Sequence, residues 1–150
     1  MKTRDKIDDS HHVLKYCGVS RWDLKDGIPR VNRKAFKTPH PSFSFNWLEY
    51  YKTDEASSLV RICECHTHRN ITKKGKILKL KVGDIKEVGR KKHTDFRIER
   101  TPNSTNKSHV SVAPSDTHSA HALFLFAEQH GILLDVPEFR KIPVEERECC

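Results

Sequence analysis

The segment His109-Val110-Ser111-Val112 holds the residues whose types and spacing point most directly to chemistry. If both valines face inward from a strand, His109 and Ser111 lie on the opposite face, because successive side chains of a strand alternate. An imidazole in that position can serve as a general base or as a phosphate ligand. The alternative is a structural role in which His109 satisfies a neighbouring loop.

The same His-x-Ser pattern resembles the strand motif of the two-histidine phosphoesterases. Those enzymes need two such motifs that face each other, and this chain supplies one good copy. The sequence therefore does not support that mechanism.

A second candidate is the stretch SFSFNWLEYY, residues 42–51, which holds five of the twelve aromatic residues of the chain. Its alternation predicts a strand with Phe43, Phe45 and Trp47 in the core. Ser44 and Asn46 then share the other face, at a strand end where sheets of α/β type place ligands. We expect Asn46 to cap a following helical turn, with Glu49 in a capping box or, if it is not used there, as a carboxylate of the site.

The block from Lys73 to Lys92 contains nine Lys or Arg residues and two acids. We expect Lys79 and Lys81 to point outward from a strand over 76–82, and Lys91 and Lys92 to follow in a turn. Such lysines can contact a phosphate backbone, and without aromatic residues beside them they would not stack on bases. The alternative is an edge strand that lysines protect from aggregation.

The segment CECHTH, residues 63–68, contains four ligand types that zinc accepts. Zinc sites use pairs of ligands separated by a long loop, whereas four ligands within one helical stretch point in different directions. We therefore predict buried thiols next to a solvated helix end, and no metal or cofactor. A second pair, His118 and His121, has the spacing of one helix face and is interpreted as a polar surface.

The composition restricts the class of partner. Lys and Arg number 28 against 20 Asp and Glu, which gives a net charge of +8 and favours polyanions, although the same charge also maintains solubility. The start has no apolar signal segment, and the longest apolar run, ALFLFA, cannot span a bilayer. With an odd number of cysteines, five, we expect free thiols in the cytoplasm and no membrane association. No Walker, Rossmann, zincin or serine-hydrolase motif is present in the sequence.

Strands and helices alternate irregularly along the chain. Apolar alternation predicts strands over 12–17, 76–82, 94–100 and 108–112, and helical spacing predicts helices over 54–66 and from Ser115 or Asp116 to His130. A strand over the segment LVRICEC, residues 59–65, is the alternative to the first helix. This pattern is typical of an α+β or α/β layer fold with a mixed sheet and two or three helices. We expect one domain over residues 12–136, a disordered N-terminus over 1–11 and an acidic tail over 137–150.

Three stretches together resemble a group of small uncharacterised bacterial proteins. They are the Arg21-Trp22 pair, the corner SFNWLEYY, which is similar to an S-V-N-W-L-E-Y-F signature, and Ser108-His109 before the last helix. The resemblance implies a bacterial protein but no activity. The order of elements is also similar to ADP-ribosyltransferase-like folds, although no glutamate stands where those enzymes have their catalytic one.

Three hypotheses follow. The first is a domain that binds RNA, DNA or a nucleotide through the Lys73–Lys92 region, with Lys79, Lys81, Lys91 and Lys92. The adjacent polar site consists of His109, Ser111, Ser44 and Asn46, with Glu49 as a further binding residue. In the second, the domain is a toxin- or defence-type enzyme that is nuclease-like or ADP-ribosyltransferase-like. Its catalytic residues are His109 as the base, Ser111 and Arg21. The third is a non-catalytic module that binds an acidic protein. The sequence does not decide whether the protein is an enzyme.

Overall fold

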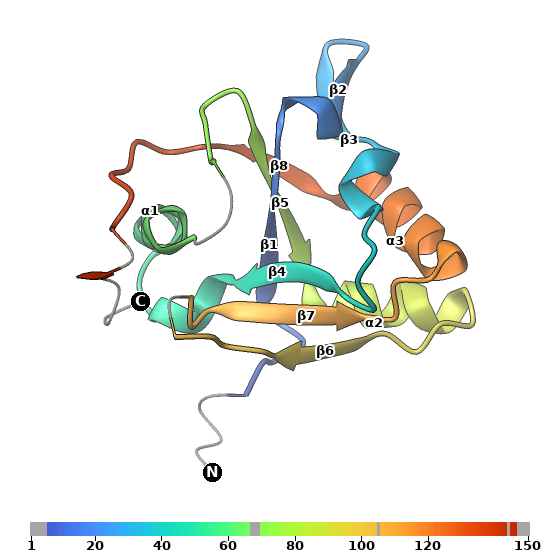
Figure 1. The fold of residues 1–150 in the computed structure, drawn as a ribbon. Coiled ribbons are helices and arrows are strands. Elements are labelled where there is room, and N and C mark those ends of the chain that lie inside the picture. Colours follow the sequence, from blue (N-terminus) through green and yellow to red (C-terminus); the bar gives the residue numbers. More distant parts are fainter. Residues whose placement is uncertain (1–5, 67–69, 105, 144, 147–150) are drawn as a thin grey trace.

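The computed structural model describes residues 6–66, 70–104, 106–143 and 145–146 (Figure 1). The strands are β1 (His12–Cys17), β2 (Trp22–Lys25), β3 (Ile28–Val31), β4 (Phe43–Trp47), β5 (Lys76–Lys81), β6 (Arg97–Arg100), β7 (His109–Ala113) and β8 (Ile132–Asp135). The α-helices are α1 (Glu55–Cys65), α2 (Val82–Lys91) and α3 (Thr117–His130), and the short 3-10 helices are η2 (Val19–Arg21), η3 (Arg33–Phe36) and η4 (Leu48–Tyr51). Among these residues no helix is long and apolar enough to cross a membrane.

Six strands form one sheet in the order β6-β7-β4-β1-β5-β8, and β2 and β3 form a separate hairpin. All five strand pairs of the large sheet are antiparallel, so the sheet is not mixed in direction. The expected single small α+β domain is confirmed. The strands β1 and β4 lie at the centre of the sheet. β5 and β8 follow on the side of β1, and β7 and β6 follow on the side of β4.

The larger core lies between one face of the sheet and the helices α2, α3 and η3. Sheet residues that point into it include Val13, Phe43, Phe45, Leu78 and Val110, all buried. The predicted inward positions of the Phe43–Trp47 strand are therefore confirmed. Burial of each such side chain contributes about 1.5–3 kcal/mol, which makes this face the main source of stability.

The second face of the sheet carries a smaller core beneath α1. Leu59, Ile62 and Cys63 of this helix pack against Leu14 and Ile77 of the central strands. The helix itself was predicted, with Ala56, Leu59, Val60 and Cys63 on its inner face. Leu59 and Cys63 are buried as expected, whereas Ala56 is exposed. The helix α1 lies over only part of this face (Figure 1), and Ser44 of β4 is exposed, His109 and Ser111 of β7 are half-buried and Asn46 is buried.

Residues 82–91 form the helix α2, where the sequence predicted the end of a strand and a turn. Val82, Ile85 and Gly89 face the core at helical spacing. Gly83 and Gly89 suggested a turn, but Gly89 instead allows Thr94 and Phe96 to pack closely against the helix. A Cβ there would lie 2.7 Å from Phe96 Cδ2, and Thr94 N donates to Gly89 O at 2.8 Å.

Both ends of the described chain are attached to the domain. Val82 N donates to His11 O at 2.9 Å and Gly83 N donates to Asp9 O at 2.8 Å, within the segment predicted to be disordered. In the predicted tail, Phe139 packs against the smaller core and Ile142 N donates to Glu64 O at 3.1 Å. The hydrogen-bonded structure therefore extends beyond the predicted limits of 12 and 136.

Candidate anion-binding site

The site is created where two central strands separate. β1 is paired with β5 along its whole length, from His12 to Cys17, but it is paired with β4 only at Val13 and Leu14. Beyond Leu14 the two strands diverge and leave a fork in the sheet. Lys15 fills the base of that fork, because its Nζ donates to Ser44 O at 3.2 Å and lies 5.3 Å from the centre of the Phe45 ring.

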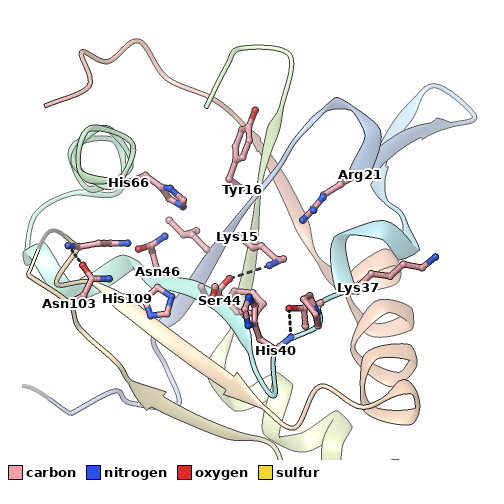
Figure 2. A pocket seen from close by; sticks show the side chains of 15 residues that line it. Lys15, Tyr16, Arg21, Lys37, His40, Ser44, Asn46, His66, Asn103 and His109 are labelled. Carbon is pink, nitrogen blue, oxygen red and sulfur yellow. Dashed lines mark hydrogen bonds between the residues drawn. The ribbon is translucent and has the colours of Figure 1, made fainter. Parts of the chain in front are cut away.

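A cavity of about 310 Å³ opens at this fork. Figure 2 shows side chains from β1, β4, β7 and three loops converging on it. The lining residues are Leu14, Lys15, Tyr16, Arg21, Lys37, Thr38, Pro39, His40, Ser44, Phe45, Asn46, His66, Asn103, Asn106 and His109. The cavity is therefore built by segments that are far apart in the sequence.

The charge of this lining is of one sign. Lys15, Arg21 and Lys37 contribute cations, and no described Asp or Glu lines the cavity. Arg21 ends η2 and is held by its backbone, which donates to Gly18 O at 2.8 Å and accepts from Asn32 N at 2.9 Å. Its guanidinium points into the cavity, whereas the Lys37 side chain extends away from the centre (Figure 2). Within the described part of the chain, the Arg21 side chain has neither a hydrogen bond nor an ion pair.

His109 enters the cavity from β7 in a defined orientation. Its Nδ1 lies 3.2 Å from Thr101 O and 2.8 Å from Thr101 Oγ1. We assign the hydrogen to Nδ1, because the Thr101 carbonyl can only accept, and in this tautomer Nε2 of the neutral ring keeps its lone pair. Burial lowers the pKa of His109 below 6.5, and the nearby Lys15 charge lowers it further, while the Thr101 carbonyl partly opposes the shift. His109 is therefore a neutral base at physiological pH.

Asn46 is fixed by a buried hydrogen-bond network. Ser108 Oγ lies 3.0 Å from Asn46 Oδ1 and 3.1 Å from Asn106 Oδ1, so its hydroxyl bridges the two amides. Asn106 N in turn donates to Asn103 Oδ1 at 2.7 Å. Because the Asn46 oxygen is engaged by Ser108, its amide nitrogen remains as a donor toward the cavity. The loop after β6 is thereby joined to the site.

Tyr16 and two further histidines complete the walls. Tyr16 Oη accepts a hydrogen bond from Thr72 N at 3.1 Å, and its ring lies over Gly75. His66 follows the last residue of α1, and its ring points toward the cavity (Figure 2). His40 comes from the loop before β4. Its backbone is held by Thr38 and Ser115, and its ring makes no hydrogen bond with another described residue.

Four predicted site residues converge on the cavity, namely Ser44, Asn46, His109 and Arg21. The register explains the first three, because Asn46 is paired with His109 and Ser44 with Ser111 across β4 and β7. Ser111 does not line the cavity, but its Oγ lies 2.8 Å from Thr101 Oγ1. It therefore supports the hydroxyl that contacts His109.

Glu49 is not part of this cavity. Its carboxylate accepts from His12 N at 2.8 Å and lies 2.8 Å from His12 Nδ1, so it is used in a structural pair. The expected capping box is also absent, because Trp47 precedes η4 and no side chain caps it. The first turn is held instead by packing of Leu48 in the core.

The four predicted phosphate-binding lysines do not line the cavity either. Lys79 is ion-paired with Glu55 at the start of α1, and Lys91 lies 3.4 Å from Glu87 on α2. Lys92 follows the last residue of α2, which packs with Val110 on the sheet face opposite to the His109 side chain. Lys81 is exposed on β5 opposite His12. These side chains therefore do not form one surface with the polar site.

The cysteines correct one expectation. Cys17 and Cys63 are free, as predicted, and both are buried. Burial together with Glu64 raises the pKa of the Cys63 thiol to about 12. Cys65, however, is disulfide-bonded, so the prediction of free thiols throughout is wrong. Among the described residues no cluster of His, Cys, Asp and Glu could hold a metal ion. His68 lies outside the described residues.

Lys15 is the main residue that the sequence interpretation missed. It alternates with Val13 and Cys17, which are fully buried, and its own exposed fraction is 7%. A lysine among core-facing positions was the available signal, because buried lysines are rare unless they have a partner or a function. His40 and Thr101 gave no comparable signal, and His66 was considered only as a zinc ligand, since only the folding of distant segments brings these residues to the fork.

Comparisons with protein-family models, curated proteins and solved structures found no significant match for this chain.

Proposed function

We propose that the cavity at the fork of β1 and β4 binds a phosphate-bearing ligand, either a nucleotide or the phosphate of an RNA or DNA strand. The observation that carries this proposal is the lining itself, which combines Lys15, Arg21 and Lys37 with three histidines and includes no described carboxylate. An anion would be attracted to this lining, and a cation would be repelled by it.

Several basic residues outside the cavity are paired with carboxylates, unlike Arg21. Lys25 lies 2.9 Å from Glu128, Lys76 lies 2.5 Å from Asp135 and Lys86 lies 2.7 Å from Asp9. Lys73 and Lys79 are also ion-paired. Much of the basic block at 73–92 is thus neutralised within the protein. Arg21 has no such carboxylate in the described part of the chain, so its charge is available to a ligand.

The neutral groups of the cavity suit phosphate as well. The Asn46 amide nitrogen, oriented by Ser108, and the Ser44 hydroxyl can donate hydrogen bonds to phosphate oxygens. Hydrogen bonds from charged donors are roughly twice as strong as neutral ones, so Lys15 and Arg21 would supply most of the affinity. The volume of about 310 Å³ is at the small end of ligand pockets, about 300–1,000 Å³, which favours a single nucleotide unit.

Calorimetric titration with adenosine 5′-monophosphate, adenosine and inorganic phosphate tests this proposal. We expect the monophosphate to bind and adenosine to bind much more weakly. Arg21→Ala should weaken binding by about 10- to 100-fold, the range for a hydrogen bond to a charged group. Lys81→Ala is the matched control, because it removes one positive charge from an exposed residue outside the cavity.

Equal losses in Arg21→Ala and Lys81→Ala would indicate a general charge effect and would contradict a specific site. A complete lack of affinity for all three compounds at low salt would also overturn the proposal. The basic charge would then be a solubility feature or a surface for an acidic protein.

A further inference from the structure

The cavity holds a base, anion-stabilising cations and a second imidazole that can exchange protons with solvent. His109 presents the unprotonated Nε2, because Nδ1 is directed at Thr101. Lys15 and Arg21 come from the other side of the fork (Figure 2). The unprotonated Nε2 goes beyond what binding of a phosphate requires, since a lone pair cannot donate a hydrogen bond to phosphate oxygens.

A neutral base beside a bound phosphodiester can contribute to cleavage only if it removes a proton from a nucleophile that attacks phosphorus. RNA brings one in the 2′-hydroxyl next to each phosphate, whereas DNA lacks it. The protein need only position the phosphate, remove the hydroxyl proton and stabilise the charge that develops on the phosphoryl oxygens. Lys15 is suited to that last role because it is buried, and charges act more strongly at low dielectric.

His40 is suited to protonating the departing oxygen. Its ring lines the same cavity and makes no hydrogen bond with another described residue. The residue is exposed, so the ring can be reprotonated from solvent between turnovers. His109, by contrast, is half-buried and anchored. The two imidazoles therefore differ in environment in the way that an acid and a base of one reaction require.

We propose that this site cleaves single-stranded RNA by transesterification, with His109 as the general base, Lys15 and Arg21 as the anion-stabilising groups and His40 as the general acid. The assignment rests on the phosphate-binding function proposed above.

In the reaction, His109 Nε2 accepts the 2′-hydroxyl proton and the 2′-oxygen attacks phosphorus. The bond from phosphorus to the 5′-oxygen breaks, and that oxygen receives a proton from the protonated His40. The products are a 2′,3′-cyclic phosphate and a 5′-hydroxyl, with no change of oxidation state. One proton has moved from the substrate to His109 and one from His40 to the product, and exchange with solvent restores both rings.

The test uses the full chain with a mixed-sequence single-stranded RNA, the same sequence as DNA, and product analysis by mass spectrometry. We expect cleavage of the RNA alone, with cyclic phosphate ends. His109→Gln should lower the rate by about 10²- to 10⁴-fold, the usual contribution of general acid–base catalysis. His130→Gln, on the last residue of α3 and outside the cavity, is the matched control.

A second substrate isolates the acid. In uridine 3′-(4-nitrophenyl phosphate) the leaving nitrophenolate needs no proton. His40→Ala should therefore slow RNA cleavage but leave this ester nearly unaffected, whereas His109→Gln should slow both. Equal sensitivity of the two substrates to His40→Ala would overturn the role of His40.

The pH profile supplies another readout. In the pH profile of kcat/KM, the acid limb, along which the rate rises with pH, should have its midpoint below pH 6.5, because burial and Lys15 lower the pKa of His109 in the free protein. The other titratable or charged groups that line the cavity are Tyr16, Arg21, Lys37, His40 and His66.

The failures of the two proposals can be told apart. Binding of the uncleavable DNA strand that depends on Arg21, together with intact RNA after long incubation, would overturn cleavage and leave the binding function. Loss of both binding and cleavage would overturn both. Cleavage of DNA at the rate of RNA would exclude the 2′-hydroxyl as the nucleophile.

Discussion

Lys15 and Ser44 bridge the two central strands at the point where their pairing ends, with Lys15 Nζ 3.2 Å from Ser44 O. A regular sheet would continue the ladder between β1 and β4 beyond Leu14. Here a charged side chain takes the place of the backbone hydrogen bonds, and the space between the strands becomes the cavity. The same lysine thus shapes the site and charges it.

Lys15→Met tests this double role. We expect affinity for adenosine 5′-monophosphate to fall by about 10- to 100-fold, because a charged hydrogen-bond donor is lost. The free energy of unfolding should stay within about 1 kcal/mol of the original value, since an apolar side chain of similar length avoids the cost of burying a charge. Urea unfolding and calorimetry measure the two quantities. Lys25→Met, on the exposed hairpin, is the control, and unchanged affinity in Lys15→Met would contradict the assignment.

Ser108→Ala should destabilise the protein and loosen the site together. Its buried hydroxyl is the donor that Asn46 Oδ1 and Asn106 Oδ1 share, and unsatisfied buried acceptors cost about 1–3 kcal/mol. Denaturant unfolding measures this loss, and ligand titration should show weaker binding because the Asn46 amide is no longer oriented. Ser104→Ala, on an exposed residue of the same loop, should change neither quantity. A fully stable Ser108→Ala protein would show that the network is dispensable.

His109 should make stability depend on pH just below neutrality. Its folded pKa is lower than its unfolded value of 6.5, so the unfolded chain binds more protons in the interval between the two values. Stability is therefore full above pH 6.5 and decreases as the pH falls through that interval. The pKa values of Asp8, Asp54, Asp116 and Asp135 are lowered from 3.8, so these groups affect stability in a more acidic range.

Thermal unfolding of the original protein and of His109→Asn measures this effect between about pH 5 and 7.5, the range in which histidine titrates. We expect a flatter profile for the variant. A bound phosphate should raise the pKa of His109, which NMR titration of the ring protons would detect. Parallel profiles for the two proteins would show that His109 titrates alike in the folded and unfolded states.

Gly75→Ala should displace the Tyr16 ring, which lines the cavity, although Gly75 itself does not line it. A Cβ at this position would lie 2.5 Å from Tyr16 Oη and 2.6 Å from Tyr16 Cζ, so the ring must move. We expect a loss of about 1–3 kcal/mol, as for overpacking elsewhere, and weaker ligand binding. Gly18→Ala is a matched control, because its Cβ would meet the same ring at an ordinary 4.0 Å. Equal free energies of unfolding for both variants would mean that the Tyr16 ring can move without loss of stability.

The sequence by itself determined the class of fold and most of its elements. Alternation of apolar residues located the strands around Phe43–Trp47 and His109–Ala113, and helical spacing with an Asp116 cap located α3. These are local properties, since the side chains of one strand or one helix turn decide them. The alternation also placed Asn46 and His109 on polar faces, although it could not pair them. The helix over residues 82–91 was missed because Gly83 and Gly89 are read locally as turn residues, whereas the contact that requires Gly89 is tertiary.

Only the tertiary structure decided which polar residues share a site. Register paired Asn46 with His109, and the early end of the β1–β4 ladder opened the space that Lys15 and Arg21 enter. The tertiary structure also pairs Lys79 with Glu55 and Glu49 with His12, and residue spacing along the chain could not reveal these pairs. The physical reason is that charged and reactive side chains form a site only where the fold brings them close together in space. The distances between these side chains depend on how the strands pair and where the pairing ends. Here the interacting segments lie more than thirty residues apart in the chain, as Glu49 and His12 do at a sequence separation of 37.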